Sequence, residues 1–189
     1  RGIFKSTNGA ASWIQKDRGV VEAGGITLRS FTIDPRDANV VYCGAELETG
    51  ERGLEYSKQK GKIYKTLDGG DNWFPVWVGD SLVRHIIVDP TDSALVYAAT
   101  GIFDREAYNS DVPNGIVGGV GVLKSLDGGT SWAQVTNGLS NLYVGYLAMH
   151  PTDRRTLYAA TGNYATARIG QASGLFVTHD GAQSWSKVI

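Results

Sequence analysis

Four acidic side chains are the candidates for acid–base chemistry in this sequence: Asp80, Asp104, Glu106 and Asp111. Hydrolysis of a glycosidic bond uses two carboxylates, which lie close together in a retaining mechanism and farther apart in an inverting one. The four candidates fall in or beside segments with the composition of loops, and no motif selects two of them as a pair. They are therefore candidates only, and the sequence leaves the catalytic residues unassigned.

Aromatic side chains accompany these carboxylates in the same segments. Aromatic rings stack on the apolar faces of sugars, while carboxylates and amides bond the sugar hydroxyls. The set predicts binding of a polysaccharide or a protein partner, and for any residue taken singly a solvated loop rim is the alternative. The predicted ligand-binding residues are Trp77, Tyr108, Tyr143 and Tyr164.

Other classes of site find little support. The formal net charge is −1, from 18 basic and 19 acidic residues, so no nucleic-acid partner is predicted. The three histidines, His85, His150 and His179, have no metal-ligand spacing, and the single cysteine, Cys43, lies in an apolar run. We therefore predict no metal, no cofactor and no disulfide, and no apolar run is long enough to span a bilayer.

The strands that position the candidate site residues are predicted from a repeated sequence motif. One pattern occurs four times: a hydroxyl residue, then Asp or Asn, a nearby Gly, and Trp at the end. The tryptophans are 60, 59 and 53 residues apart, a period typical of stacked repeat architectures. The Asp or Asn and Trp of the four copies are Asn8 and Trp13, Asp68 and Trp73, Asp127 and Trp132, and Asp180 and Trp185.

A second phrase precedes each of the last three copies, with Asp-Pro or His-Pro at 34–35, 89–90 and 150–151, and a β-rich run follows it. Pro, Asp and Gly between short β-branched and aromatic runs indicate strands joined by turns. The predicted strands are 2–6 and 13–16; then 30–34, 40–45, 61–66 and 73–78; then 85–89, 95–100, 120–125 and 132–136; and then 146–150, 156–161, 174–178 and 185–189.

Four-stranded antiparallel units repeated at this spacing predict a β-propeller, an all-β fold. We expect a single partial propeller domain over 1–189: a half blade at 1–18 and three blades at about 28–78, 84–137 and 145–189. Because propellers usually close with four to eight blades, about three and a half blades do not close a ring. The remaining blades would come from a longer chain, which the start in mid-repeat favours, or from a second copy.

The repeated motif has a structural interpretation. Its Asp or Asn accepts backbone hydrogen bonds of its own turn, the hydroxyl residue does the same, and Gly supplies unusual backbone angles. The Trp is expected to bury its ring between adjacent blades. In an up-and-down blade these turns share one face with the Asp-Pro turns. The long loops, at roughly 46–60, 101–119 and 162–173, then lie on the opposite face, where function concentrates.

The four motifs resemble the Asp-box, or bacterial neuraminidase repeat, over the whole chain. Families that share it include sialidases, glycoside hydrolases of family 74, sortilin-type receptors and photosystem II assembly factors. The Val-Asp-Pro-Thr-Asp phrase, the Val-Tyr-Ala-Ala-Thr-Gly strand and the Leu-Asp-Gly-Gly box make the sortilin and family 74 group the most similar. No arginine triad typical of sialidases can be assigned.

The resemblance implies a bacterial extracellular or cell-surface protein. Our first hypothesis is a non-enzymatic interaction scaffold that binds a polysaccharide or protein through its long loops. The alternative is a fragment of a glycoside hydrolase acting on a β-glucan such as xyloglucan, and an intracellular assembly factor is a third hypothesis. Family 74 enzymes place catalytic aspartates between two complete propellers, and no carboxylate here matches that family's catalytic motif.

Overall fold

The structure, a computed structural model, describes residues 2–20, 26–48, 61–79, 81–101, 112–115, 119–162 and 173–189. Strands make up the regular structure of these residues, apart from one short 3₁₀ helix, η2 (Val112–Asn114). The all-β class is therefore confirmed. Within the described ranges, no helix has the length and apolarity needed to cross a membrane.

The strands form one two-stranded sheet and three four-stranded sheets, all antiparallel, in which consecutive strands are neighbours. The first sheet holds β1 (Phe4–Lys5) and β2 (Ile14–Gln15), and the second holds β3 (Ile26–Asp34), β4 (Asp37–Glu48), β5 (Gly61–Thr66) and β6 (Phe74–Gly79). The third holds β7 (Leu82–Asp89), β8 (Asp92–Gly101), β9 (Val122–Ser125) and β10 (Ala133–Gln134), and the fourth holds β11 (Val144–Met149), β12 (Leu157–Thr161), β13 (Gly174–Thr178) and β14 (Ser186–Lys187).

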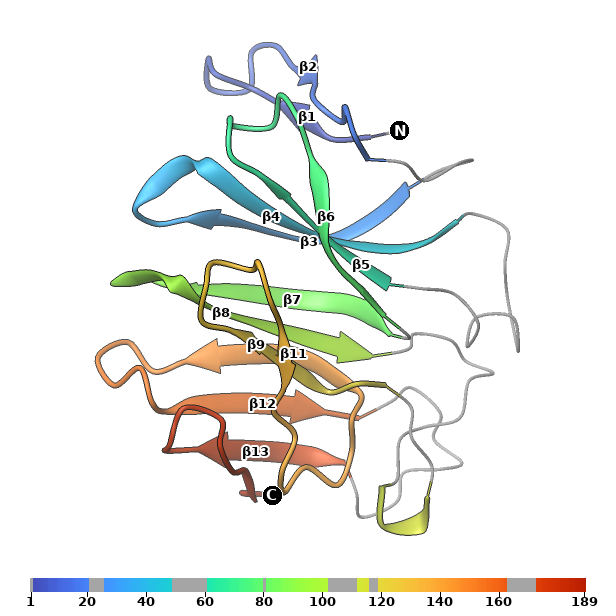
Figure 1. Cartoon of the computed structure of the whole chain (residues 1–189), viewed down its shortest axis with the longest axis vertical. Coiled ribbons are helices and arrows are strands. Elements are labelled where there is room, and N and C mark those ends of the chain that lie inside the picture. The colour runs from blue at the N-terminus through green and yellow to red at the C-terminus, as the bar shows by residue number, and fades with distance from the viewer. Residues whose placement is uncertain are drawn as a thin grey trace.

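The sheets follow one another in chain order along the long axis of the molecule (Figure 1). The first hairpin lies at one end and the β11–β14 sheet at the other, and the β3–β4, β7–β8 and β11–β12 turns lie on the same side. One two-stranded and three four-stranded units in this arrangement form the partial β-propeller of about three and a half blades that the repeat predicts.

The observed strands β5 and β13 have the predicted limits, whereas β4 is longer than the predicted 40–45. The reason is the tight turn before it. Asp34 at the end of β3 already pairs with Asp37 at the start of β4, so the ladder begins at the turn itself. The outermost strands β10 and β14 are shorter than predicted, since each has only two residues and pairs on one side only, whereas β6 has the predicted length.

The hydrophobic core lies between successive sheets, because alternate residues of each strand face opposite neighbours. A small cluster around Cys43, Tyr64 and Trp73 joins the first hairpin to the second sheet. A second cluster, which includes Tyr42 and Ile86, joins the second and third sheets. The largest cluster joins the third and fourth sheets. The propeller is thus held together by side chains that each contact the next unit.

The repeated motif forms the β5–β6, β9–β10 and β13–β14 turns, and each copy repeats one hydrogen-bond pattern. In the first of these turns, Asp68 accepts from the backbone N–H of Asn72 at 2.9 Å, and Thr66 Oγ1 accepts from Gly70 N at 3.0 Å. Each turn also donates a backbone bond to the other turn of its own sheet, for example from Gly69 N to Asn39 O at 2.9 Å. These bonds are the ones that the structural interpretation of the motif expects, and they join the repeated turns to the Asp-Pro turns on the same face.

Two details of the motif differ from expectation. Ala10 and Ala182 take the left-handed φ of 70° at positions where the other copies have glycine. Trp73 and Trp185 are buried against the preceding unit, but Trp13 is 58% exposed. The indole packs on the unit before its own, and no such unit precedes Trp13 among the described residues.

Hydrogen bonds between successive sheets converge on one carbonyl in each motif. Gly128 O accepts from Tyr42 Oη and from Lys65 Nζ, both at 2.7 Å. Gly181 O accepts in the same way from a tyrosine and a lysine of the third sheet, Tyr97 at 3.3 Å and Lys124 at 2.8 Å. The tyrosine–lysine pair on a glycine carbonyl is therefore a repeated feature of the interface between complete units.

Candidate functional site

The end of the sheets opposite the repeated turns is where β6 ends and where the inner strands β7 and β11 begin. Two of the predicted binding aromatics lie there, Trp77 within β6 and Tyr143 immediately before β11. The other predicted site residues fall outside the described residues: Asp80, Asp104, Glu106, Tyr108, Asp111 and Tyr164. The site is therefore built from the strand ends themselves.

Tyr143 is a packing residue at this end rather than an open stacking surface. It is only 9% exposed, and a Cβ on Gly101 at the end of β8 would lie 2.8 Å from its ring. The guanidinium of Arg84 lies 6.0 Å from the centroid of the Tyr143 ring, within the range of a cation–π contact. Tyr143 thus fixes the position of Arg84 relative to the start of β11.

Trp77 also packs inward. It is partly buried against the cluster between the second and third sheets, and a Cβ on Gly79 would lie 2.3 Å from its ring. Because Gly79 at the end of β6 has no side chain, the indole of Trp77 can occupy this space. Neither of the two predicted aromatics within the described ranges is strongly exposed.

The segment that leads into β11 is held by a buried amide. Asn141 is fully buried, accepts from the backbone N–H of Tyr143 at 2.9 Å and donates through Nδ2 to Ser173 Oγ at 3.3 Å. Gly162 N also donates to Tyr143 O at 3.1 Å. These bonds tie the entry of the inner strand to the segments beside it and make this end of the sheet rigid.

The most exposed aromatic at this end is Tyr146 of β11, which is not among the binding residues predicted from the sequence. Its ring stacks on that of His85 in β7, with centroids 4.0 Å apart and an interplanar angle of 26°. His85 is partly buried, and burial lowers the pKa of its imidazole. Tyr146 is 56% exposed, so one aromatic ring is presented outward on a fixed support.

A signal for this pair was present in the sequence. Ser30, His85 and Tyr146 occupy the same repeat position, four residues before the Asp or His of the Asp-Pro phrase. Comparing the three copies at that position shows a polar or aromatic residue where a strand facing only apolar neighbours would carry an aliphatic one.

Four buried side-chain atoms have no hydrogen-bond partner within the described part of the chain: Ser30 Oγ, Ser81 Oγ, His85 Nδ1 and Asp89 Oδ2. Most buried polar side chains in proteins have a partner, and exceptions often have a functional role. His85 Nδ1 belongs to the ring that stacks on Tyr146, whereas Asp89 lies at the other end of β7, beside the turn.

The carboxylates of the repeated turns already accept hydrogen bonds from residues of the same turns. Hydrogen bonds from Asn72 and Thr66 lower the pKa of Asp68 to about 2, and those from Ser131 and Ser125 lower the pKa of Asp127 to about 2. A carboxylate held ionised by its own turn is not available as a general acid near neutral pH. The repeated turns therefore form the supporting face of the molecule.

The histidines on that face have structural partners too. His150 replaces Asp in the third Asp-Pro phrase, and its Nδ1 accepts from the backbone of Asp153 at 3.0 Å, as the aspartates of the other copies accept in their turns. His179 Nδ1 lies 3.0 Å from Thr156 Oγ1. No group of three or more His, Cys, Asp or Glu within the described ranges could hold a metal ion.

Comparison with known proteins finds similarity of fold but no match in sequence. No protein-family model matches the chain, and no curated protein sequence does so. Among solved structures, a glycoside hydrolase family 74 enzyme of Niastella koreensis matches 98% of this chain with a TM-score of 0.67 and 22% identity. An ancestral family 74 enzyme matches 99% of the chain with a TM-score of 0.65 and 17% identity.

The chain spans only 26% and 21% of the length of these two enzymes. A variant of an α-L-arabinofuranosidase from Fusarium graminearum, in complex with an iminosugar inhibitor, matches 86% of the chain and 47% of its own length, with a TM-score of 0.50 and 14% identity. These similarities support the partial propeller and its likeness to the family 74 group.

Proposed function

We propose that this chain is a segment of a larger β-propeller that binds a polysaccharide at the start of its inner strands and does not itself catalyse a reaction. The observation that carries the proposal is the exposed ring of Tyr146, fixed by its stack on His85. A saccharide needs a flat apolar surface for its C–H face and polar groups at its edge. Tyr146 offers the surface, and its own hydroxyl is a polar group at the edge of the ring.

The end of the sheets where the inner strands begin suits this role because it is rigid. Asn141 anchors the entry to β11, and Tyr143 holds Arg84 beside it. A preorganised aromatic loses little conformational freedom when it binds, which raises affinity. Tyr108 and Tyr164, which the sequence predicts as ligand-binding residues, are proposed to extend this surface.

The proposal also covers the location of the protein and the source of its remaining blades. The four Asp-box-like turns and the sortilin-type and family 74 resemblance support an extracellular or cell-surface location. The remaining blades would belong to a longer chain or a second copy, and a protein ligand on the same face is the alternative to a polysaccharide.

The test is affinity electrophoresis in native gels cast with xyloglucan, another β-glucan or an unrelated α-glucan. We expect the wild-type chain to be retarded by a β-glucan and Tyr146→Ala to migrate as it does without polysaccharide. Tyr158→Ala is the matched control, since it removes a partly exposed tyrosine of the same sheet. Equal retardation of the two variants, or none of the wild type, contradicts the proposal.

A second function, a glycoside hydrolase fragment, is favoured by the similarity to two family 74 enzymes. In this case two of the candidate carboxylates would act on a β-glucan such as xyloglucan. Release of reducing ends by the protein, lost in Asp104→Asn or Asp111→Asn with binding retained, would support it. Binding without any release of reducing ends, at protein concentrations that saturate the polysaccharide, supports the scaffold instead.

A further inference from the structure

The surface of β3 that faces the first hairpin exposes apolar side chains whose repeat equivalents are buried. Phe31 is 50% exposed and Ile33 is 59% exposed. The residues at the same two positions in β7 are Ile86 and Val88, which are 1% and 4% exposed because the second sheet covers them. The first hairpin has only two strands, so it covers β3 incompletely.

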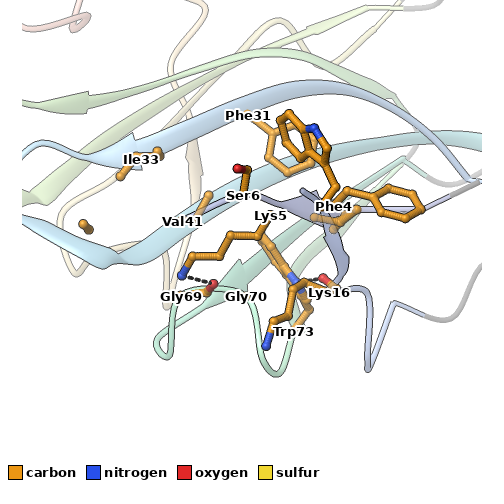
Figure 2. A pocket seen from close by; sticks show the side chains of 13 residues that line it. Phe4, Lys5, Ser6, Lys16, Phe31, Ile33, Val41, Gly69, Gly70 and Trp73 are labelled. Atoms are coloured by element: carbon orange, nitrogen blue, oxygen red, sulfur yellow. Dashed lines mark hydrogen bonds between the residues drawn. The ribbon is translucent and has the colours of Figure 1, made fainter. Parts of the chain in front are cut away.

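A cavity of about 320 Å³ lies at this place, between the first hairpin and the second sheet. Figure 2 shows its lining, with Phe31 and Ile33 from β3, Trp73 on the turn side and Lys5 reaching across to the backbone of Gly69. The walls are mainly apolar, and the polar side chains among them are Ser6, Lys16 and Lys5, of which Lys5 donates to Gly69 O at 2.9 Å.

The two interfaces between complete sheets have the same surroundings and contain a tyrosine there. Tyr42 lies among the equivalents of the cavity residues: it packs with Val88 and shares the Gly128 carbonyl with Lys65. Tyr97 does the same at the next interface. At the cavity, the Gly69 carbonyl accepts from Lys5, and no tyrosine of the described residues reaches it.

We infer that the cavity and the free edge of β1 form a docking site for a β-hairpin with the inner-strand sequence of this repeat. The second strand of the hairpin pairs with β1 and places its tyrosine in the cavity, with the hydroxyl donating to Gly69 O. The register follows from the three complete sheets. In them Tyr42, Tyr97 and Tyr158 stand opposite Lys65, Lys124 and Val177, so the docked tyrosine stands opposite Lys5.

A second copy of the folded chain is not the occupant, because its inner hairpins are already in use. The second strand of each such hairpin, β4, β8 or β12, pairs on its far side with the third strand of its own sheet. Pairing with β1 would require that sheet to open. The site therefore selects a hairpin that has the repeat sequence but no third strand of its own.

The probe is a fluorescently labelled peptide of residues 82–101, which carries both inner strands and their turn, titrated into the protein and followed by anisotropy. We expect saturable binding that the Ile33→Asp variant of the protein loses at least tenfold. Leu126→Asp, at an exposed apolar position on a turn of another sheet, is the matched control and should bind normally. A Tyr97→Phe peptide should bind roughly threefold to tenfold more weakly, the range for one hydrogen bond.

A covalent version keeps the test decisive if the free peptide does not form a hairpin. The same segment is fused ahead of Gly2 through a flexible linker of about 20 residues, a length that spans such distances easily. We expect slower amide hydrogen exchange at residues 3–6 than in a fusion that carries a scrambled segment. Unchanged exchange in the fusion overturns the inference, and so does concentration-dependent self-association that Ile33→Asp abolishes, because a second copy would then occupy the site.

Discussion

Replacing Tyr42 with phenylalanine removes one hydrogen bond from the interface between the second and third sheets and keeps the ring packing. The buried hydroxyl donates to Gly128 O at 2.7 Å, and Lys65 donates to the same carbonyl at 2.7 Å. Because Lys65 still satisfies the carbonyl, no buried acceptor is orphaned. The free energy of unfolding should therefore fall by only about 1 kcal/mol. Tyr42→Ala also loses the ring from the core, at a cost of about 3–5 kcal/mol.

The assay is equilibrium unfolding in urea, followed by tryptophan fluorescence. The control is Tyr158→Phe, at the same repeat position in the last sheet, where the side chain is 37% exposed. Its unfolding free energy should stay within about 0.5 kcal/mol of wild type. Equal losses in Tyr42→Phe and Tyr158→Phe would refute the claim that the tyrosine stabilises the contact between successive sheets.

Three further predictions concern the turns. Gly138→Ala should destabilise the fold by more than about 1 kcal/mol in urea unfolding, because φ is +92° and the added Cβ would lie 2.1 Å from Trp185 O; an unchanged midpoint would contradict the packing described. Ala10→Gly should raise the unfolding free energy by about 0.5–1 kcal/mol, because Ala10 holds a left-handed φ of 70° on an exposed turn; a loss of stability would argue against strain there. Because the pKa values of Asp68 and Asp127 are lowered to about 2, their stabilisation is present above the unfolded pKa of about 3.9 and is lost as the pH falls through 2. Thermal melts from pH 5 to 2 should therefore fall less steeply for Asp68→Asn with Asp127→Asn than for wild type, and parallel curves would contradict this.

The regular part of the fold was predictable from the sequence because it depends on local chemistry. The hydroxyl, Asp and Gly of each repeated turn bond one another within a few residues, so each copy specifies its own conformation. The exposure of Trp13 was not predictable in the same way. Its environment depends on the unit that precedes it in space, and the motif itself is identical whether or not that unit is present.

The candidate site was less predictable for a similar reason. Trp77 and Tyr143 are aromatic residues of the kind found in binding surfaces, but the neighbouring glycines Gly79 and Gly101 allow both rings to pack inward. The ring that does face outward, Tyr146, lies within a strand rather than a loop. Its support comes from His85, 61 positions earlier in the sequence, through a contact between different sheets. Such a pairing follows from the stacking of units and not from any local pattern.

The central claim is that the repeated turns form a support and that ligand binds at the opposite end, where the inner strands begin. Amide hydrogen exchange, measured with and without the polysaccharide that retards the protein most strongly, tests it directly. The account predicts slower exchange on binding at residues 82–86 and 142–147. Protection confined to the turns at 66–73, 125–132 and 178–185 would contradict it, since the ligand would then occupy the face described here as structural.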